Sequence, residues 1–191
     1  MHGSIIRTLL VSFAKGDEKY MMTEKIAVDL LKAAESLGIT VWIGGGFGVD
    51  ALIGKETRPH DDIDVYIDIK NADSFINMLK TKGYNEVEME YTTLSHMVWQ
   101  DSKGHIVDLH LMEFKEEDPD SLYFQEWTFP ISLLDGNGTI GGFPINCFTA
   151  EAQLLFHQGY EPLEKDIHNV KVLCKTFGLE VPEDYARLIS E

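Results

Sequence analysis

The sequence predicts an α+β domain in which helices flank a mixed β-sheet and the C-terminal part is helical. Segments with helix and strand periods alternate from residue 23 to about 112, a strand-rich stretch follows, and helix-period segments end the chain. The 191 residues, 44% hydrophobic and 25% charged, fit one globular unit and exclude disorder. We divide the chain into a leading segment (1–22), a core (23–112), an acidic and aromatic insert with a β-hairpin (113–148) and C-terminal helices (149–191), all in one compact unit.

The core begins with a helix that Thr23 caps and that ends before Gly38, a residue type suited to the left-handed C′ position. A β-branched run over 39–43 predicts a buried strand, and a short helix is expected after Gly44–Gly46. The other elements predicted for the core are a strictly alternating strand over 61–68, a helix over 72–82 and a strand over 84–90.

Hairpins are predicted on both sides of the boundary between the core and the insert. Residues 94–100 and 105–112 are expected to pair through a turn at 101–104, and a second hairpin is expected around Asp135–Gly138. Two helices then end the chain, one capped by Thr149 and running to about residue 158, the other with Pro162 in its first position and Gly178 after its end.

The chain is strongly acidic, with a formal net charge of −16. Such a charge repels phosphate backbones, so we expect no nucleic-acid partner. It suits a cationic small-molecule acceptor or divalent metal ions. The alternative is that the acidity only aids solubility, and the sequence leaves both open.

The cysteines and the N-terminal apolar run favour a cytoplasmic protein without a membrane partner. Cys147 and Cys174 form neither a disulfide framework nor a metal-ligand pattern. The run Ile5–Ala14 is interrupted by Arg7, is too short to span a bilayer, and is not followed by a clear signal-peptidase site.

The most informative segment is His60-Asp61-Asp62-Ile63-Asp64-Val65. The period of a strand places Asp62 and Asp64 on one face while Ile63 and Val65 point into the core. Two carboxylates on adjacent same-face positions repel each other unless a cation lies between them, and Mg²⁺ is the natural hard cation for oxygen ligands. Solvated structural acids are the alternative for this pair taken alone.

A glycine run precedes these aspartates. Gly44-Gly45-Gly46-Phe47-Gly48 joins a predicted strand to a predicted helix, where free backbone N–H groups and the positive helix end are suited to hold phosphate. Tight packing alone is the other reason for such a turn. Phosphate binding beside paired carboxylates is a coherent arrangement for phosphoryl or nucleotidyl transfer.

A third carboxylate, Asp108, lies mid-strand in His105-Ile106-Val107-Asp108-Leu109-His110. A carboxylate among apolar strand neighbours is disfavoured unless it is paired with a cation or binds metal. A salt bridge to a Lys or Arg is the structural alternative.

With these residues the chain resembles the polymerase-β-like nucleotidyltransferase superfamily, in its aminoglycoside 2″-adenylyltransferase-like and lincosamide nucleotidyltransferase branch. The resemblance covers about residues 23–178, and as an ordered set its motifs are specific. It lies in the segments Trp42–Leu52, Arg58–Asp64 and Val107–His110, and more weakly in Gly138–Gly142, His157–Glu161 and Lys165-Asp166.

The resemblance implies a nucleotidyltransferase-like fold and transfer of a nucleoside monophosphate, AMP from ATP, onto a hydroxyl of a small molecule. It implies that Asp62 and Asp64 hold two Mg²⁺ ions and that Asp108 completes the metal site and takes the proton of the acceptor hydroxyl. It also implies that Gly45 and Gly46 line the phosphates of the NTP. Arg58 and Lys165 are the candidates to neutralise those phosphates.

The chain departs from the superfamily pattern in two ways, both of which concern phosphate contacts more than the metal site. Many members have Ser where this chain has Gly46, which removes a hydroxyl from the phosphate site. The spacing from Gly46 to Asp62 is also longer than the commonest one, although it is usual for this branch.

Other residues invite weaker interpretations. His60-Asp61 matches the paired His-Asp of metal phosphohydrolases but lacks their other ligands. His157 and His168 lie on predicted helices and are expected to be ordinary polar-face residues. Tyr123 and Trp127, in the acidic stretch 113–126, are weak candidates for an acceptor pocket, the alternative being a loop that aromatics anchor to the core.

The sequence thus favours an antibiotic-type small-molecule nucleotidyltransferase, with an aminoglycoside or a lincosamide as acceptor. Two alternatives remain, the same chemistry on a protein side chain and a binding module of antitoxin type that has lost activity. The intact set of Asp62, Asp64 and Asp108 favours an enzyme. Acceptor identity, nucleotide preference and oligomeric state are not predicted.

Overall fold

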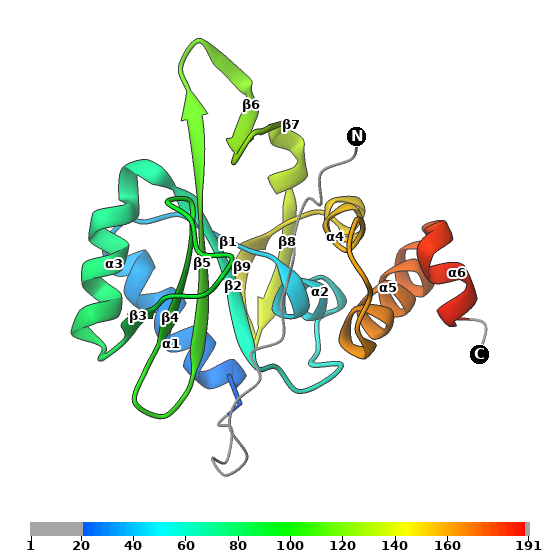
Figure 1. Ribbon diagram of the computed structural model, residues 1–191, viewed down its shortest axis with the longest axis horizontal. Coiled ribbons are helices and arrows are strands. Elements are labelled where there is room, and N and C mark those ends of the chain that lie inside the picture. Colours follow the sequence, from blue (N-terminus) through cyan, green and yellow to red (C-terminus); the bar gives the residue numbers. More distant parts are fainter. Residues whose placement is uncertain (1–20, 190–191) are drawn as a thin grey trace.

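The structure is a computed structural model that describes residues 21–189 (Figure 1). The expectations for the apolar run Ile5–Ala14 and for nearly all of the leading segment lie outside these residues. Within them, no helix is long and apolar enough to cross a membrane.

A mixed sheet of nine strands forms the centre of the described chain, which confirms the predicted fold class. Its main path runs β3-β4-β5-β2-β1-β9-β8, and β6 and β7 extend from β5. The pairs β2/β5 and β1/β9 are parallel and the other pairs antiparallel. The strands are β1 (Val41–Ile43), β2 (Asp62–Asp68), β3 (Asn85–Val87), β4 (His96–Gln100), β5 (Ile106–Lys115), β6 (Asp118–Phe124), β7 (Trp127–Pro130), β8 (Gly136–Ile140) and β9 (Phe143–Cys147).

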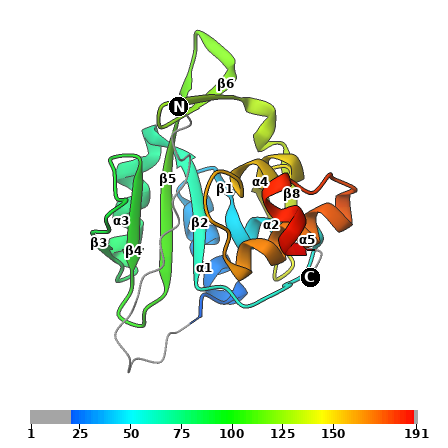
Figure 2. The same ribbon diagram turned by 45° about the vertical axis from the view of Figure 1, so that its right-hand side comes forward.

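Helices cover the sheet in two groups. One group, α1 and α3, packs on the face of β2 that carries Ile63, Val65 and Ile67, and there it forms the main hydrophobic core. The other, α2, α4 and α5, packs together beside β2 (Figure 2), and Phe47 and Ala51 of α2 also join the main core. The helices are α1 (Glu24–Ser36), α2 (Gly45–Ile53), α3 (Ala72–Thr81), α4 (Ala150–Phe156), α5 (Glu164–Phe177) and α6 (Glu183–Ile189), with 3-10 turns η1 (Ile69–Asn71) and η2 (Ile131–Leu134).

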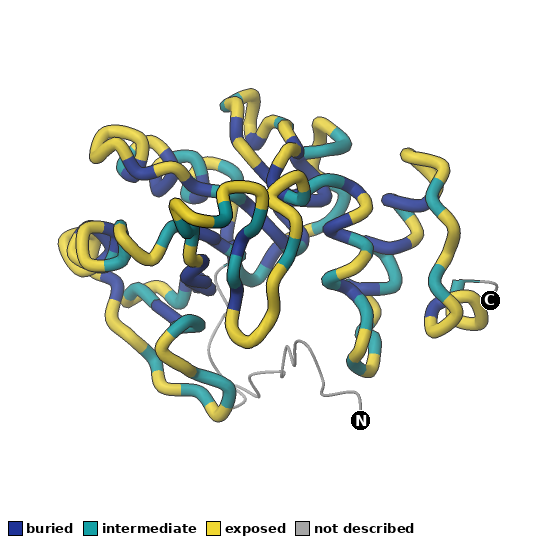
Figure 3. The backbone as a smooth tube through the Cα atoms, turned by 90° about the horizontal axis from the view of Figure 1, so that it is seen from above, coloured by how far each residue is buried: buried dark blue, intermediate teal, exposed yellow. Residues whose placement is uncertain are grey.

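Most of the predicted elements are present because their local signals agree with their packing. The Thr23 hydroxyl accepts from the Ile26 N–H at 3.4 Å and caps α1, and the Thr149 hydroxyl caps α4. The turn at 101–104 joins β4 to β5 as predicted. Buried residues follow the strands and the inner helix faces, while the connecting loops are exposed (Figure 3).

The predicted hairpin turn around Asp135–Gly138 is wrong, because these residues begin strand β8. The turn lies at Gly141-Gly142, where both residues have positive φ angles of 54° and 77°. A side chain on Gly138 would overlap the Ala51 backbone of α2, so this glycine permits close backbone approach rather than a turn.

Pro162 does not occupy the first position of α5, as the sequence predicts, because the helix begins at Glu164. Leu163 is its N-cap residue, and the Leu163 N–H donates to Asp166 Oδ2 at 2.9 Å. This side-chain contact begins the helix two residues later than a first position at Pro162 would require.

Candidate active site

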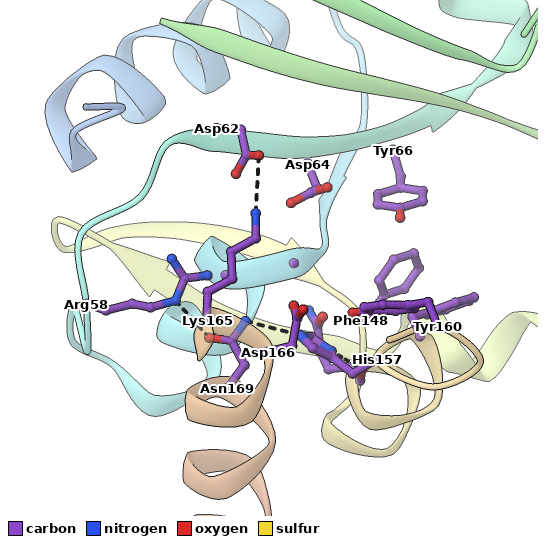
Figure 4. A pocket seen from close by; sticks show the side chains of 14 residues that line it. Arg58, Asp62, Asp64, Tyr66, Phe148, His157, Tyr160, Lys165, Asp166 and Asn169 are labelled. Carbon is purple, nitrogen blue, oxygen red and sulfur yellow. Dashed lines mark hydrogen bonds and ion pairs between the residues drawn. The ribbon is translucent and has the colours of Figure 1, made fainter. Parts of the chain in front are cut away.

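Strand β2 presents two aspartates on the face opposite the main core. Ile63 and Val65 are buried under α1 and α3, so the alternation of the strand turns Asp62 and Asp64 to the other face. Figure 4 shows both carboxylates pointing into a pocket, in line with Tyr66. Their side chains are 23% and 27% exposed, so a ligand can reach them.

The parallel pairing of β2 with β5 places Asp108 directly beside Asp64. The two residues are register partners, and register partners on neighbouring strands point to the same face. The Asp108 side chain is 10% exposed, and its Oδ1 lies 3.3 Å from Nε2 of His96 on β4. The sheet therefore brings the three predicted aspartates to one face, although only Asp62 and Asp64 line the pocket itself.

The two pocket carboxylates differ in proton affinity. Burial raises the pKa of Asp62 to about 6, repulsion from Asp64 and Asp108 adds to this, and Lys165 opposes it. Burial also acts to raise the pKa of Asp64, but contact with His110 and the charge of Lys165 outweigh it and lower that pKa below its usual value. The fold thus holds like charges together at a free-energy cost that a cation would relieve.

This donor set fits a divalent cation that shares its coordination with a substrate. Carboxylate oxygens are the ligands that Mg²⁺ prefers, and in phosphate sites it commonly binds one or two carboxylates plus phosphate oxygens. Within residues 21–189, no group of three His, Cys, Asp or Glu side chains is arranged to hold a metal by itself.

The glycine turn packs directly against these acids. Gly45, the first residue of α2, has a φ of 52°, and a Cβ there would overlap the Asp64 carboxylate. A Cβ on Gly46 would overlap the side chains of Arg58 and His60. The second overlap explains why this chain has glycine rather than serine at position 46. The turn leaves the N-terminus of α2 open beside Asp64.

Two cations reach the same pocket from different elements. Lys165, in the first turn of α5, extends toward β2, where its Nζ lies 3.8 Å from Asp62 Oδ2 (Figure 4). Burial acts to lower the pKa of Lys165, but Asp62, Asp64 and another nearby carboxylate raise it above its usual value. Arg58 lies in the loop before β2 and lines the pocket near Gly46. The pocket therefore combines carboxylates of the kind that bind divalent metals, the N-terminus of α2, and the positive charges of Lys165 and Arg58.

The sequence that forms this site matches a known protein family. A family model described as aminoglycoside-2″-adenylyltransferase matches residues 27–173, which include all the site residues named so far. The chain belongs to the aminoglycoside-2″-adenylyltransferase family. It is a nucleotidyltransferase, as its resemblance to that branch implies, and the interpretation as a binding module without activity is set aside.

Relatives of this family member are similar over nearly their whole length. A lincosamide resistance protein from Staphylococcus haemolyticus is 29% identical over 161 residues, which cover 80% of this chain and 94% of that protein. A 2″-aminoglycoside nucleotidyltransferase from Klebsiella pneumoniae is 26% identical over 162 residues, covering 81% and 87% respectively.

Solved structures agree with the adenylyltransferase fold. The lincomycin-bound crystal structure of the lincosamide antibiotic adenylyltransferase LnuA aligns with a TM-score of 0.72 and 29% identity, covering 82% of this chain and 99% of that one. ANT(2″)-Ia in complex with adenylyl-2″-tobramycin aligns with a TM-score of 0.66 and 22% identity, covering 81% and 89%, and supports the fold alone.

Several pocket residues of this adenylyltransferase-family chain are not predicted by its sequence. Tyr66 follows Asp64 by two residues, so the alternation of β2 was a signal that could have found it. The others come from α4, α5 and the flanking loops. The weak resemblance segments His157–Glu161 and Lys165-Asp166 cover three of them, and the rest have no local signal. The unpredicted lining residues are Tyr66, Phe148, Gln153, Phe156, His157, Tyr160, Asp166 and Asn169.

The prediction that His157 is an ordinary polar-face residue is wrong. It is the C-cap residue of α4, is 5% exposed and lines the pocket. His168 does lie on a helix, where its Nε2 is 3.0 Å from Thr57 Oγ1. His60, the first residue of the His-Asp pair, is buried, and its Nε2 lies 2.6 Å from Asp50 Oδ2, so it supports the loop that leads into β2.

A stack of aromatic rings lies next to Asp64. His110 on β5 stacks between Tyr66 and His96, with centroid distances of 4.3 and 4.1 Å. Its Nε2 lies 3.8 Å from Asp64 Oδ1, beyond hydrogen-bond length. Burial lowers the pKa of His110, and the neighbouring His96 lowers it further. The stack therefore places the buried imidazole of His110 next to Asp64.

Tyr123 and Trp127 lie on the two-stranded ribbon formed by β6 and β7, which projects from the sheet (Figure 1). The Tyr123 hydroxyl donates to Asp118 Oδ2 at 2.6 Å, and Lys115 Nζ lies 3.7 Å from the centroid of the Tyr123 ring. Trp127 is 38% exposed. Neither residue lines the pocket, and their role as acceptor contacts stays a prediction.

Proposed function

We propose that this protein transfers AMP from ATP to a hydroxyl group of a lincosamide or aminoglycoside antibiotic and releases pyrophosphate. The observation that carries the proposal is one pocket in which Asp62 and Asp64 face Lys165 and Arg58 across the glycine turn. Relatives named for lincosamides and aminoglycosides indicate the acceptor class. The net charge of −16 favours acceptors that carry amines.

Asp62 and Asp64 are the residues that would hold two Mg²⁺ ions together with oxygens of the triphosphate, and Asp108 would complete one of the two sites. When bound, the ions neutralise the phosphate charge that repels an attacking alcohol and stabilise the departing oxygen. The raised pKa of Asp62 supports this assignment, because a cation removes the repulsion that causes part of the shift.

The protein's own groups position the reactants. The backbone N–H groups of Gly45 and Gly46 at the start of α2 face the phosphates, and Lys165 and Arg58 neutralise them. The acceptor oxygen attacks the α-phosphorus, the bond from that phosphorus to the bridging α–β oxygen breaks, and pyrophosphate leaves. Asp108 takes the hydroxyl proton, a contribution of about 10²–10⁴-fold for a positioned base.

His96 would hold Asp108 in place for this step. Its Nε2 lies 3.3 Å from Oδ1 of the carboxylate, so we assign the proton transfer to Oδ2. We also propose a cytoplasmic location, because the reaction consumes ATP.

The test is pyrophosphate release from Mg·ATP with a panel of lincosamides and aminoglycosides, each compared with a reaction that lacks acceptor. We expect release that depends strictly on one of these classes and an acceptor whose mass increases by one adenylyl group. The absence of pyrophosphate release with every compound of the panel would contradict the proposed acceptors. It would favour a protein side chain as the acceptor.

A further inference from the structure

Arg58 is held on two sides by hydrogen bonds that leave one guanidinium nitrogen for a ligand. Its Nε donates to Asn169 Oδ1 at 3.1 Å, and its Nη1 donates to the Pro59 carbonyl at 2.9 Å. The remaining nitrogen, Nη2, is the one that a side chain on Gly46 would strike. The guanidinium is therefore turned so that Nη2 faces the first turn of α2.

Asn169 is fixed in one orientation because both ends of its amide have a partner. Its oxygen accepts from Arg58, so its Nδ2 must be the atom that faces His157 Nε2, at 3.0 Å. Asn169 is 2% exposed, so water does not compete for either contact. The reverse orientation would place two donors, Nε–H and NH₂, against each other.

His157 is fixed in turn by its own contacts. Its Nε2 accepts from Asn169, so its proton lies on Nδ1, which donates to the Gln153 carbonyl at 2.7 Å. Burial lowers the pKa of His157, which favours this neutral form. The hydroxyl of Tyr185 on α6 donates to the His157 carbonyl. Arg58, Asn169 and His157 therefore each donate to the next member of the chain, which ends at the Gln153 carbonyl in α4.

We infer that Asn169 and His157 are positioning residues for the nucleotide, which hold the Arg58 guanidinium with Nη2 directed at the phosphate of an NTP bound at the start of α2. This rests on the proposed function, because it requires that an NTP binds at the glycine turn. Arg58 is separated from Asn169 by 111 positions in the sequence. The hydrogen-bond chain thus couples α4 and α5, the helix that also supplies Lys165, to the position of Arg58 in the nucleotide site.

The loss variant is Asn169→Leu, which has a similar shape and removes both hydrogen bonds. With Arg58 free to leave its position, we expect the affinity for a non-hydrolysable ATP analogue with Mg²⁺ to fall about tenfold, the size expected for one charge-assisted contact. The KM for ATP should rise by the same factor while kcat changes less than threefold. Calorimetric titration and steady-state kinetics measure the two effects.

The conservative variant Asn169→Asp tests position separately from packing. Its carboxylate still accepts from Arg58, while its other oxygen faces His157 Nε2, which must then carry a proton. We expect most of the affinity to return and the His157 imidazole to become doubly protonated near neutral pH, which NMR of labelled histidine detects. The signal of the Arg58 Nε–H should be protected in the wild type and in Asn169→Asp, and exchange-broadened in Asn169→Leu.

A double-mutant cycle separates positioning from a general structural role. In an Arg58→Met background, Asn169→Leu should cost no further affinity for the ATP analogue, because its only route to the nucleotide is gone. Val170→Ala is the matched control, since Val170 is the next residue on α5, is fully buried and packs in an apolar cluster with Cys174 and Tyr185. It should lower the melting temperature and leave analogue affinity within twofold of the wild type.

The outcomes distinguish this inference from the proposed function. Additive losses in the cycle, or unchanged analogue binding by Asn169→Leu, would overturn the positioning role while the proposed function stands. A wild-type protein that binds no ATP analogue would overturn both.

Discussion

Two acidic regions within residues 21–189 differ in the surroundings of their carboxylates, and the first of them brings three aspartates together on one face of the sheet. On β2 and β5, Asp62 and Asp64 lie on one face with Asp108, and burial with mutual repulsion raises the pKa of Asp62 to about 6. On the β6–β7 ribbon, Asp118 accepts from the Tyr123 hydroxyl, and this contact lowers its pKa. Register on neighbouring strands, rather than the density of acidic residues, therefore indicates the site.

The largest expected effect comes from Asp64→Asn, which keeps the size of the side chain and removes a charge that we propose binds metal. We expect at least a 10³-fold loss of kcat/KM for adenylyl transfer with no loss of melting temperature, because repulsion in the pocket is reduced. Pyrophosphate release and thermal unfolding measure these. Glu117→Gln, in the exposed turn between β5 and β6, is the control and should retain full activity. Near-normal turnover by Asp64→Asn would remove this carboxylate from the mechanism.

A second large effect is expected from Gly45→Ala. The positive φ of 52° and the overlap with the Asp64 carboxylate both oppose a side chain there. We expect about 10²-fold lower activity and a loss of about 1–3 kcal/mol in the free energy of unfolding. Gly142→Ala, at a positive φ in open space, is the control and should lose stability only. Equal activity losses in both variants would show that backbone strain alone, and not contact with Asp64, is responsible.

The pH dependence of stability sharpens the comparison between the two regions. A folded-state pKa raised above the unfolded value of 3.8 stabilises the protein below that value and loses this contribution as pH rises through about 6. In the metal-free protein, Asp62 should therefore lower the free energy of unfolding by about 1–2 kcal/mol between pH 4 and 7. Asp64, with its lowered pKa, acts in the opposite direction and below that window.

Urea unfolding in EDTA across this pH range measures the effect. The drop should be absent in Asp62→Asn and present in Glu117→Gln, and Mg²⁺ should reduce it in the wild type. If the free energy of unfolding of the wild type and of Asp62→Asn changed with pH in the same way, Asp62 would titrate like an ordinary carboxylate.

The smallest effect is expected on the ribbon. Trp127 does not line the pocket, so Trp127→Ala should change kcat/KM for the acceptor by no more than about threefold and leave the KM for ATP unchanged. Steady-state kinetics with the best acceptor of the panel measures this. A tenfold rise in acceptor KM would assign the ribbon to acceptor binding, as the sequence weakly suggests.

The parts of the site that follow from local periodicity were predictable. Alternation along 61–68 places Asp62 and Asp64 on one face, and the mid-strand position of Asp108 points to a paired or metal-binding role. The glycine run predicts a strand-to-helix turn, and the structure begins α2 there. These features depend on neighbours within a few residues, so the sequence displays them directly.

The parts that depend on distant contacts were not predictable. Asn169 acts on Arg58 across the fold, and His157 is buried by residues of α5 and α6 that no local pattern brings to it. The sequence predicts a turn at the glycines of β8, because the Ala51 backbone of α2, which Gly138 packs against, lies far away in the sequence. Glycine indicates a close approach or a turn, and only the tertiary structure decides between them.

The most direct test of the central claim is to count bound divalent ions with Mn²⁺, whose electron paramagnetic resonance signal distinguishes free from bound metal. In the presence of a non-hydrolysable ATP analogue, the wild type and Glu117→Gln should each bind two ions per chain, and Asp64→Asn should lose the tight binding of at least one. The same number of tightly bound ions in all three proteins would contradict the claim that the aspartates of β2 and β5 form the metal site.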